Sequence, residues 1–202
     1  TIPILANVLI ETEGNTLKLL ATDIEVTLSS SCEAAVEKPG GVTLPAKKLY
    51  EIVRSLPDGD VKLVSSKDGN HVTVSADRFE SKMPPMPVAD FPSPAASDMA
   101  NAIPLASASL RQLISKTQFA ITGEDTRYYL NGAMFVVKAD SMTMVATDGH
   151  RLALASAVRA GGKGDDVKAI LPRKTLAELG RLLADSDRDV EYERGENHMF
   201  FR

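Results

Sequence analysis

Residues 146–153, Ala-Thr-Asp-Gly-His-Arg-Leu-Ala, hold the side chains best suited to chemistry. Asp148 and His150 have the types of an acid–base pair or of two metal ligands. Two ligands are too few for a closed metal site, and the sequence contains no glycine-rich phosphate loop. The other histidines, His71 and His198, stand at equivalent positions of an internal repeat. We therefore expect no catalytic residue, no metal site and no cofactor.

An earlier copy of this motif separates its constant residues from its variable ones. Residues 21–26 read Ala-Thr-Asp-Ile-Glu-Val, so they keep the Thr and the Asp and lack the Gly-His-Arg. We interpret the shared Thr and Asp as scaffold. The residues that the later copy adds, Gly149, His150 and Arg151, are the better candidates for a binding site.

The repeat extends over most of the chain. Residues 44–56 match residues 171–183 with seven identities in thirteen positions, at an offset of 127. Upstream, residues 17–23 match residues 142–148 at an offset of 125. Such a repeat predicts two homologous domains in tandem.

A proline-rich segment separates the two copies. Five of the eleven prolines lie between Met83 and Asn101, which forbids a regular helix and suits an extended connector. We place one domain at residues 1–99 and the other at residues 100–202. Because Thr1 aligns with Thr126, we expect the first domain to lack its N-terminal part and, by the same register, the second to lack its C-terminal part.

Three segments carry the one-sided apolar stripe of an amphipathic helix: Pro45–Leu56, Leu105–Ile121 and Pro172–Ala184. Gly180 interrupts the third stripe, which indicates a close contact there. Between the helices the apolar period is two, as in strands. The strand residues include Leu17, Leu19, Ile24, Val26, Leu28, Val61, Leu63, Val72 and Val74. A helix followed by about three strands, used twice per domain, predicts an α+β fold with helices on one face and antiparallel sheets on the other.

Composition narrows the class of protein. The chain has 202 residues, 44% of them hydrophobic, enough for the cores of one or two domains. It lacks a signal-peptide pattern and any apolar run near the roughly 20 residues that span a bilayer, so we expect a cytoplasmic protein. The single cysteine, Cys32, has no partner for a disulfide and is expected to be a small buried hydrophobe.

Charge is distributed unevenly along the chain. The net charge is −4, yet each predicted helix carries a net charge of +2, so the rest of the chain carries −10. If the helices share a face, that face is basic and suits a phosphate backbone, without any motif that reads base sequence. The helix cations are Lys47, Lys48, Arg54, Arg111, Lys116, Arg173, Lys174 and Arg181.

Five motifs resemble those of bacterial sliding clamps, the β subunits of DNA polymerase III, in order along the chain. They are Thr1–Asn7, Ala21–Asp23, Asp90–Pro92, Arg127–Gly132 and Ala146–Ala153. The resemblance implies the DNA-clamp fold, with three domains per subunit, each built from two units of a helix plus three or four strands. The third domain would be absent from this chain. Two intact subunits would close into a homodimer ring around duplex DNA.

The resemblance also implies a function. The ring would be a non-catalytic processivity factor of a DNA-directed DNA polymerase holoenzyme in DNA replication. It would tether the replicative polymerase, the clamp loader and repair proteins through their short peptide motifs. The second-domain half of the peptide pocket would comprise Arg127, Leu130, Thr147, Gly149, His150, Arg151 and Leu152.

Two aromatic residues, Tyr128 and Tyr129, match family residues near the DNA path, and buried strand aromatics are an equally ordinary interpretation. Glu124 departs from the uncharged polar residue that would suit a DNA-facing loop, so we assign it no role. Two other functions stay open. A hydrolase would use Asp148 and His150 and lose activity on His150→Ala, whereas a duplicated protein-interaction module would make no salt-dependent DNA contact.

Overall fold

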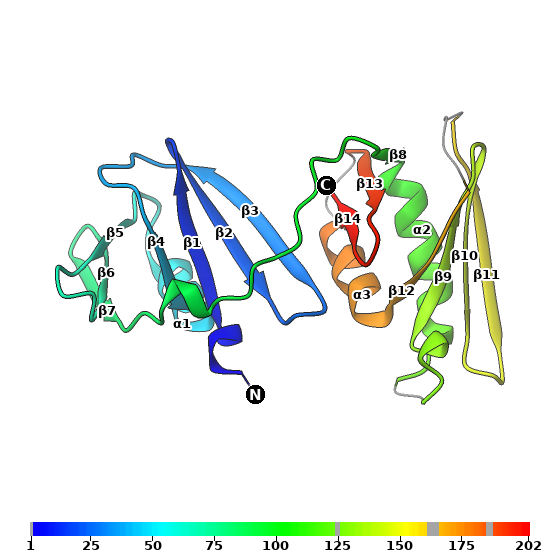
Figure 1. Ribbon diagram of the computed structural model, residues 1–202, viewed down its shortest axis with the longest axis horizontal. Helices are drawn as coiled ribbons and strands as arrows, with labels where there is room; N and C mark the ends of the chain where they lie inside the picture. The colour runs from blue at the N-terminus through cyan, green and yellow to red at the C-terminus, as the bar shows by residue number, and fades with distance from the viewer. Residues whose placement is uncertain (1, 124–125, 161–165, 185–187) are drawn as a thin grey trace. The chain divides into compact units, whose positions relative to one another are not determined.

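A computed structural model gives the fold. It describes residues 2–123, 126–160, 166–184 and 188–202. The chain divides into two compact units, Thr1–Pro94 and Ala95–Arg202 (Figure 1). None of the described helices is long and apolar enough to cross a membrane.

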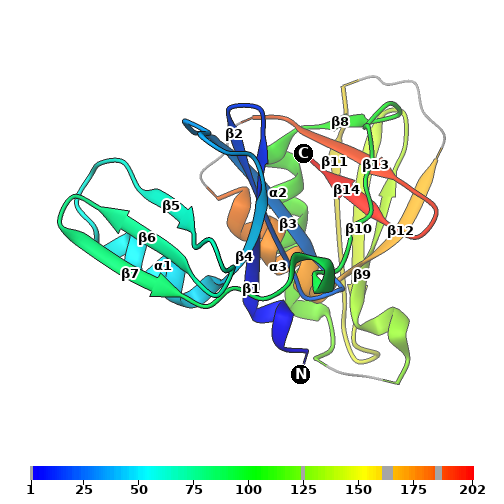
Figure 2. The same cartoon turned by 60° about the vertical axis from the view of Figure 1, so that its left-hand side comes forward.

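The first unit pairs a four-stranded sheet, of order β3-β2-β1-β4, with a three-stranded sheet, of order β5-β6-β7 (Figures 1 and 2). All of its strand pairs are antiparallel. Its strands are β1 (Asn7–Glu13), β2 (Thr16–Thr22), β3 (Thr27–Glu33), β4 (Gly41–Pro45), β5 (Lys62–Ser65), β6 (Val72–Ala76) and β7 (Phe79–Met83). Its helix is α1 (Ala46–Ser55), with short 3-10 turns η1 (Pro3–Ala6) and η2 (Val88–Asp90).

The second unit repeats this plan and adds a strand and a helix at its start. Its sheets have the orders β11-β10-β9-β12 and β14-β13-β8, again antiparallel. The strands are β8 (Ile103–Leu105), β9 (Gly132–Val137), β10 (Ser141–Thr147), β11 (Leu152–Val158), β12 (Val167–Pro172), β13 (Val190–Arg194) and β14 (Met199–Phe201). The helices are α2 (Ser107–Thr117) and α3 (Arg173–Leu182), with 3-10 turns η3 (Gln118–Ala120) and η4 (Tyr128–Leu130).

The sequence repeat corresponds to one repeated strand–helix element. Pro45 ends β4 and Pro172 ends β12, and in each case the helix begins at the next residue. Proline costs little at this position because the first N–H groups of a helix have no intrahelical partner. The helix predicted over residues 105–121 is shorter, because Leu105 pairs with Val190 as the end of β8. Four strands, not about three, follow that helix.

The second unit encloses the larger core. Helices α2 and α3 contact each other, and the buried faces of both helices join the core of the two sheets. At its centre the rings of Phe135 and Tyr192 meet edge to face, 5.7 Å apart. Helix α1, by contrast, has no fully buried residue. The described part of the first unit has no helix equivalent to α2 that could cover it.

Four local expectations were wrong, and one of them concerns Val26, which lies between β2 and β3 and not in a strand. Ile24 lies in the turn before β3 with φ of +82°, not in a strand, and Val61 precedes β5. Cys32 is exposed because β3 is an edge strand whose seven residues are all exposed. Alternating apolar residues predict a half-buried strand only where a second layer covers one face.

The connector belongs structurally to the first unit as far as Pro94. The hydroxyl of Thr43 donates to the Met86 carbonyl at 2.7 Å and accepts from its N–H at 3.0 Å. Phe91, only 6% exposed, packs in a small cluster with Ile4. These contacts hold the proline-rich segment on the sheet, so the boundary between units falls earlier than residue 99.

Gly180 allows a stability prediction. A Cβ at this position would lie 3.6 Å from Cγ2 of Ile114, an ordinary contact distance, so the helix contact leaves room for a methyl group. We expect Gly180→Ala to stabilise the protein by about 1 kcal/mol, the difference in helix propensity. Urea unfolding measures this change. A less stable variant would mean that α2 and α3 pack more closely than described.

Candidate functional site

The turn between β10 and β11 is held by two side chains. The Asp148 carboxylate accepts hydrogen bonds from the N–H groups of His150, at 3.0 Å, and Arg151, at 2.9 Å. The Thr147 hydroxyl donates to the Arg151 carbonyl at 2.7 Å and accepts from the Gly149 N–H at 3.1 Å. Thr147 and Asp148 therefore hold the turn, and the residues between them and β11 are presented to solvent.

These bonds change the acidity of Asp148. The Arg151 and then the His150 N–H groups lower its pKa from 3.8 to about 2, because they stabilise the carboxylate. The folded-state pKa lies below the unfolded one, so the turn is fully stabilised above about pH 4 and weakens as the pH falls towards 2. A carboxylate of such low pKa is a poor base near neutral pH. The carboxylate is instead occupied by the backbone N–H groups of the turn and by Arg151, and no described hydrogen bond joins it to the His150 imidazole.

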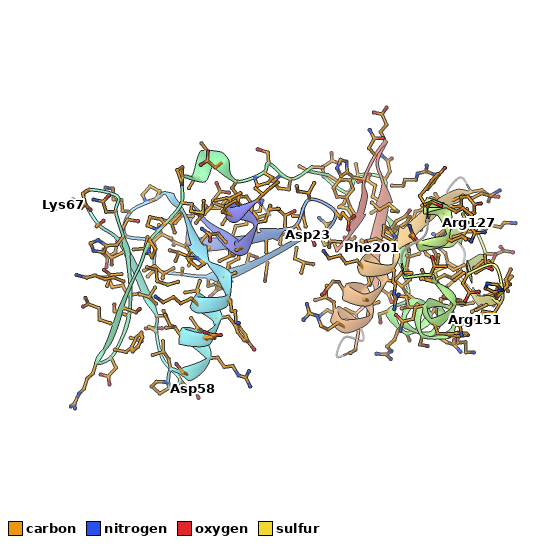
Figure 3. All side chains as sticks on the ribbon, turned by 90° about the horizontal axis from the view of Figure 1, so that it is seen from below. Asp23, Asp58, Lys67, Arg127, Arg151 and Phe201 are labelled. Carbon is orange, nitrogen blue, oxygen red and sulfur yellow. The ribbon has the colours of Figure 1, made fainter. Side chains whose placement is uncertain are left out.

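The turn between β2 and β3 in the first unit has the same hydrogen bonds. The Asp23 carboxylate (labelled in Figure 3) accepts from the N–H groups of Glu25, at 3.2 Å, and Val26, at 2.9 Å. The Thr22 hydroxyl accepts from the Ile24 N–H at 3.1 Å and donates to the Val26 carbonyl at 3.3 Å. The Thr–Asp pair thus determines the turn in both units.

The third residue of each turn has a positive φ, +82° at Ile24 and +89° at Gly149. Glycine adopts this conformation freely, whereas a β-branched residue pays about 1–2 kcal/mol. Ile24 is nevertheless 64% exposed, so burial does not explain its presence. The turn therefore tolerates either residue, and glycine is required at neither position to form it.

Two arginines surround Gly149. The Arg127 guanidinium lies so close that a Cβ on Gly149 would be 3.8 Å from its Nη1. Arg151 Nε donates to the Asp148 carboxylate at 2.9 Å and its Nη2 donates to the Phe119 carbonyl at 2.8 Å. Figure 3 labels both arginines on the second unit.

Apolar surface at the site comes from two residues. Leu152 is 65% exposed and Phe119 is 57% exposed, whereas Leu130 is only 4% exposed and belongs to the core. The Leu130 carbonyl accepts hydrogen bonds from the backbone and side chain of Thr122, which fixes the neighbouring loop. Leu130 therefore offers little surface to a ligand, whereas Leu152 presents its side chain to solvent.

Phe119 is the site residue that the sequence reasoning missed. It lies in η3, just after α2, and is separated from Arg151 by 32 residues. The one available signal was its position off the apolar stripe of Leu110, Leu113 and Ile114. An aromatic residue on the polar side of a helix end is a candidate for a surface contact.

The predicted DNA-facing cations differ in their surroundings. Arg111 is half-buried, and its Nη1 donates to the carbonyls of Leu183, at 3.0 Å, and Ala184, at 3.2 Å, beyond the end of α3. Arg181 pairs with Glu178 at 2.8 Å. Arg111 therefore joins the two helices. We expected its guanidinium to extend into solvent, and it does not. The other helix cations, Lys47, Lys48, Arg54, Lys116, Arg173 and Lys174, are exposed.

The two candidate tyrosines are surface residues, so the buried alternative is wrong. Tyr128 is 77% and Tyr129 52% exposed, with their rings in edge contact at 5.8 Å. Glu124 lies outside the described residues. That all three helices share one face stays a prediction.

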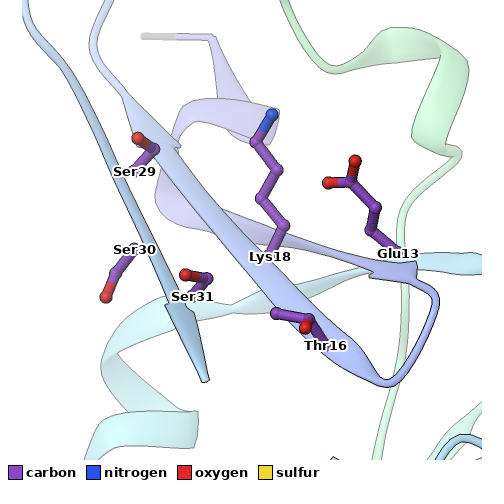
Figure 4. A pocket seen from close by; sticks show the side chains of 6 residues that line it. All are labelled: Glu13, Thr16, Lys18, Ser29, Ser30 and Ser31. Atoms are coloured by element: carbon purple, nitrogen blue, oxygen red, sulfur yellow. The ribbon is translucent and has the colours of Figure 1, made fainter. Parts of the chain in front are cut away.

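A polar hollow lies elsewhere, on the first unit. It has a volume of about 320 Å³ and is formed by β1, β2 and β3 (Figure 4). Its lining residues are Glu13, Thr16, Lys18, Ser29, Ser30 and Ser31. With hydroxyls and charges of both signs, it offers no surface to an apolar peptide anchor.

Comparison with known protein families identifies the family of this chain. Residues 1–95 match the N-terminal domain of the DNA polymerase III beta subunit, and residues 104–202 match its central domain. The chain belongs to the bacterial sliding-clamp family. The clamp resemblance drawn from the motifs is confirmed, and the order of the two matches follows the order of the units.

Individual sliding clamps agree with this assignment. The chain is 41% identical over 197 residues to the beta sliding clamp of Caulobacter vibrioides, covering 95% of this chain and 53% of that protein. It is 35% identical to the Escherichia coli clamp, with 98% and 54% covered. A crystal structure of the Pseudomonas aeruginosa beta subunit superimposes with a TM-score of 0.93 at 36% identity, with 100% and 56% covered. The α+β clamp fold is thus confirmed, and the chain spans about half the length of these relatives.

Proposed function

We propose that this chain forms the first two domains of a DNA polymerase processivity factor. The observation that carries the proposal is the match of its two homologous units to successive domains of one clamp subunit. In the intact protein, two subunits would form a ring around duplex DNA in the bacterial cytoplasm. The ring would hold a polymerase on its template by topology, without catalysing a reaction itself.

Contact with DNA would be electrostatic and independent of sequence. Each of the three helices has a net charge of +2 on an acidic protein, which favours phosphates at the helices and repels them elsewhere. Tyr128 and Tyr129 would extend this surface with exposed aromatic rings. We leave Arg111 out of the test because its guanidinium caps α3.

The test replaces four exposed helix cations by Ala: Lys47, Lys48, Lys116 and Arg173. We expect this variant of the intact protein to bind DNA roughly tenfold or more weakly at low salt. Its affinity should also depend less steeply on salt concentration. The matched control removes four exposed lysines outside the helices, Lys18, Lys67, Lys82 and Lys138. Fluorescence anisotropy with two unrelated duplexes measures both sets. Equal losses in the two sets would mean that net charge, and not the helix surface, attracts DNA.

The second unit would contribute half of a peptide pocket. Leu152 supplies exposed apolar surface beside the polar groups of His150 and Arg151, and Gly149 leaves the approach to the turn open. Short motifs of the polymerase, the clamp loader and repair proteins would bind here. The opposite wall of the pocket would lie outside this chain, so the fragment should bind such peptides more weakly than the intact clamp.

We expect Leu152→Ala to weaken binding of a polymerase tail peptide to the intact clamp by about 2 kcal/mol, roughly 30-fold, because it removes an apolar contact of the anchor. Calorimetry measures this loss. Leu154→Ala is the matched control, since Leu154 is similarly exposed, at 62%, further along β11. If both variants bound like the unmodified protein, the pocket would lie elsewhere.

A further inference from the structure

Phe119 is exposed although the two residues that follow it are buried. Ala120 and Ile121 lie in the core at 0% and 5% exposure, whereas 57% of Phe119 is open to solvent. Its ring therefore does not serve the core. Instead it lies under the Arg151 guanidinium, whose central carbon is 5.6 Å from the ring centroid.

The Arg151 side chain is held at three points. Nε donates to Asp148 at 2.9 Å, Nη2 donates to the Phe119 carbonyl at 2.8 Å, and the guanidinium plane meets the Phe119 ring. Two of these three contacts are made by Phe119. Within the described residues, Nη1 has no hydrogen-bond partner, so the guanidinium keeps N–H donors for a ligand.

The turn itself does not need this arrangement. Val26 stands at the position of Arg151 in the first unit, and the same four hydrogen bonds form there without a guanidinium. The contact between Arg151 and Phe119 is thus an addition of the second unit. A purely structural role in the turn does not account for it.

We propose that Phe119 is a positioning residue of the peptide site, which fixes the Arg151 guanidinium so that the N–H groups of Nη1 meet an acceptor of the bound peptide. The proposal rests on the proposed function of this site. A long side chain that is ordered before binding loses less rotamer freedom on binding. Arg151 would then bind an acceptor group more tightly than a mobile surface arginine does.

A double-mutant cycle in the intact clamp tests the coupling. Calorimetry with the C-terminal peptide of the organism's own replicative polymerase is run on Phe119→Leu, Arg151→Gln and the double variant. We expect Phe119→Leu to weaken binding about two- to fivefold, the range of one exposed cation–π contact, and to have no effect once Arg151 is Gln. Additive losses, or no loss from Phe119→Leu alone, would overturn the positioning role.

A second readout does not depend on the peptide. In the NMR spectrum of the free protein, the Arg151 side-chain protons should show a ring-current shift that disappears in Phe119→Leu and persists in Leu182→Ala, an exposed control on α3. Absence of the shift in the unmodified protein would contradict the proposal. If the shift is present and no variant binds peptide, the proposed function of the site fails while the contact between Phe119 and Arg151 stands.

Discussion

Gly149→Ile will abolish measurable peptide binding to the intact clamp and leave the turn between β10 and β11 folded. The first unit already contains this turn with an isoleucine at φ of +82°, so the backbone can hold the substitution at a cost of about 1–2 kcal/mol. The new side chain would project where Ile24 does, into solvent, and would fill the approach beside Arg127. We expect a loss of at least about 100-fold in affinity, more than for removal of a single apolar anchor.

The reciprocal change provides the control. Ile24→Gly relieves the left-handed strain and removes a side chain that is 64% exposed, so we expect stability to rise by roughly 0.5–1 kcal/mol without effect on peptide binding. Calorimetry measures affinity, and urea unfolding measures stability. Unfolding of the second unit by Gly149→Ile would contradict the equivalence of the two turns, and an unchanged affinity would place the peptide elsewhere.

Arg159→Ala will destabilise the second unit by about 3 kcal/mol, the largest stability effect that we expect. Arg159 is 6% exposed, and its guanidinium donates to the carbonyls of Lys138, at 3.0 Å, and Pro104, at 3.4 Å. Its described partners are all backbone carbonyl groups. The hydrogen bonds to them connect the end of β11 to β8 and to the turn after β9. Both hydrogen bonds are partly buried and come from a charged donor, and losing such a bond costs about 1.5–3 kcal/mol.

The control for this variant is Arg181→Ala. Arg181 is exposed and pairs with Glu178 one turn away on α3, an interaction worth roughly 0.5 kcal/mol or less. Urea unfolding of the intact protein compares the two variants. A loss below about 1 kcal/mol for Arg159→Ala would mean that water replaces the guanidinium at these carbonyls.

Much of the fold was predictable because its signals are local. Helices α1 and α3 were predicted to within two residues at each end. The signals were the proline that ends β4 or β12 and the apolar stripe that follows it. The comparison of the two copies of the Ala-Thr-Asp motif separated scaffold from surface residues. The repeat alone was enough to find the scaffold residues. The hydrogen bonds of Thr and Asp that form the turn connect residues at most four apart, so the motif itself contains all of the partners.

The remaining features depend on contacts that no local pattern encodes. Phe119 meets Arg151 across 32 residues, and Arg111 reaches the end of α3 across 72 residues. The apolar alternation of Ile24, Val26 and Leu28 resembled a strand, although a positive φ at Ile24 interrupts it. The burial of Cys32 depends on whether another layer covers β3. That is a tertiary contact, which the local sequence does not encode.

Retention on closed and on cut DNA tests the central claim, a topological tether, most directly. The intact clamp is loaded onto a nicked circular duplex by its clamp loader and then washed in high salt, which suppresses the electrostatic contacts of the helices. The DNA is then cut at one site and the bound protein is measured again. We predict that the clamp stays on the circle and leaves the linear molecule. Equal retention on both forms, or release from the circle in high salt, would contradict the account.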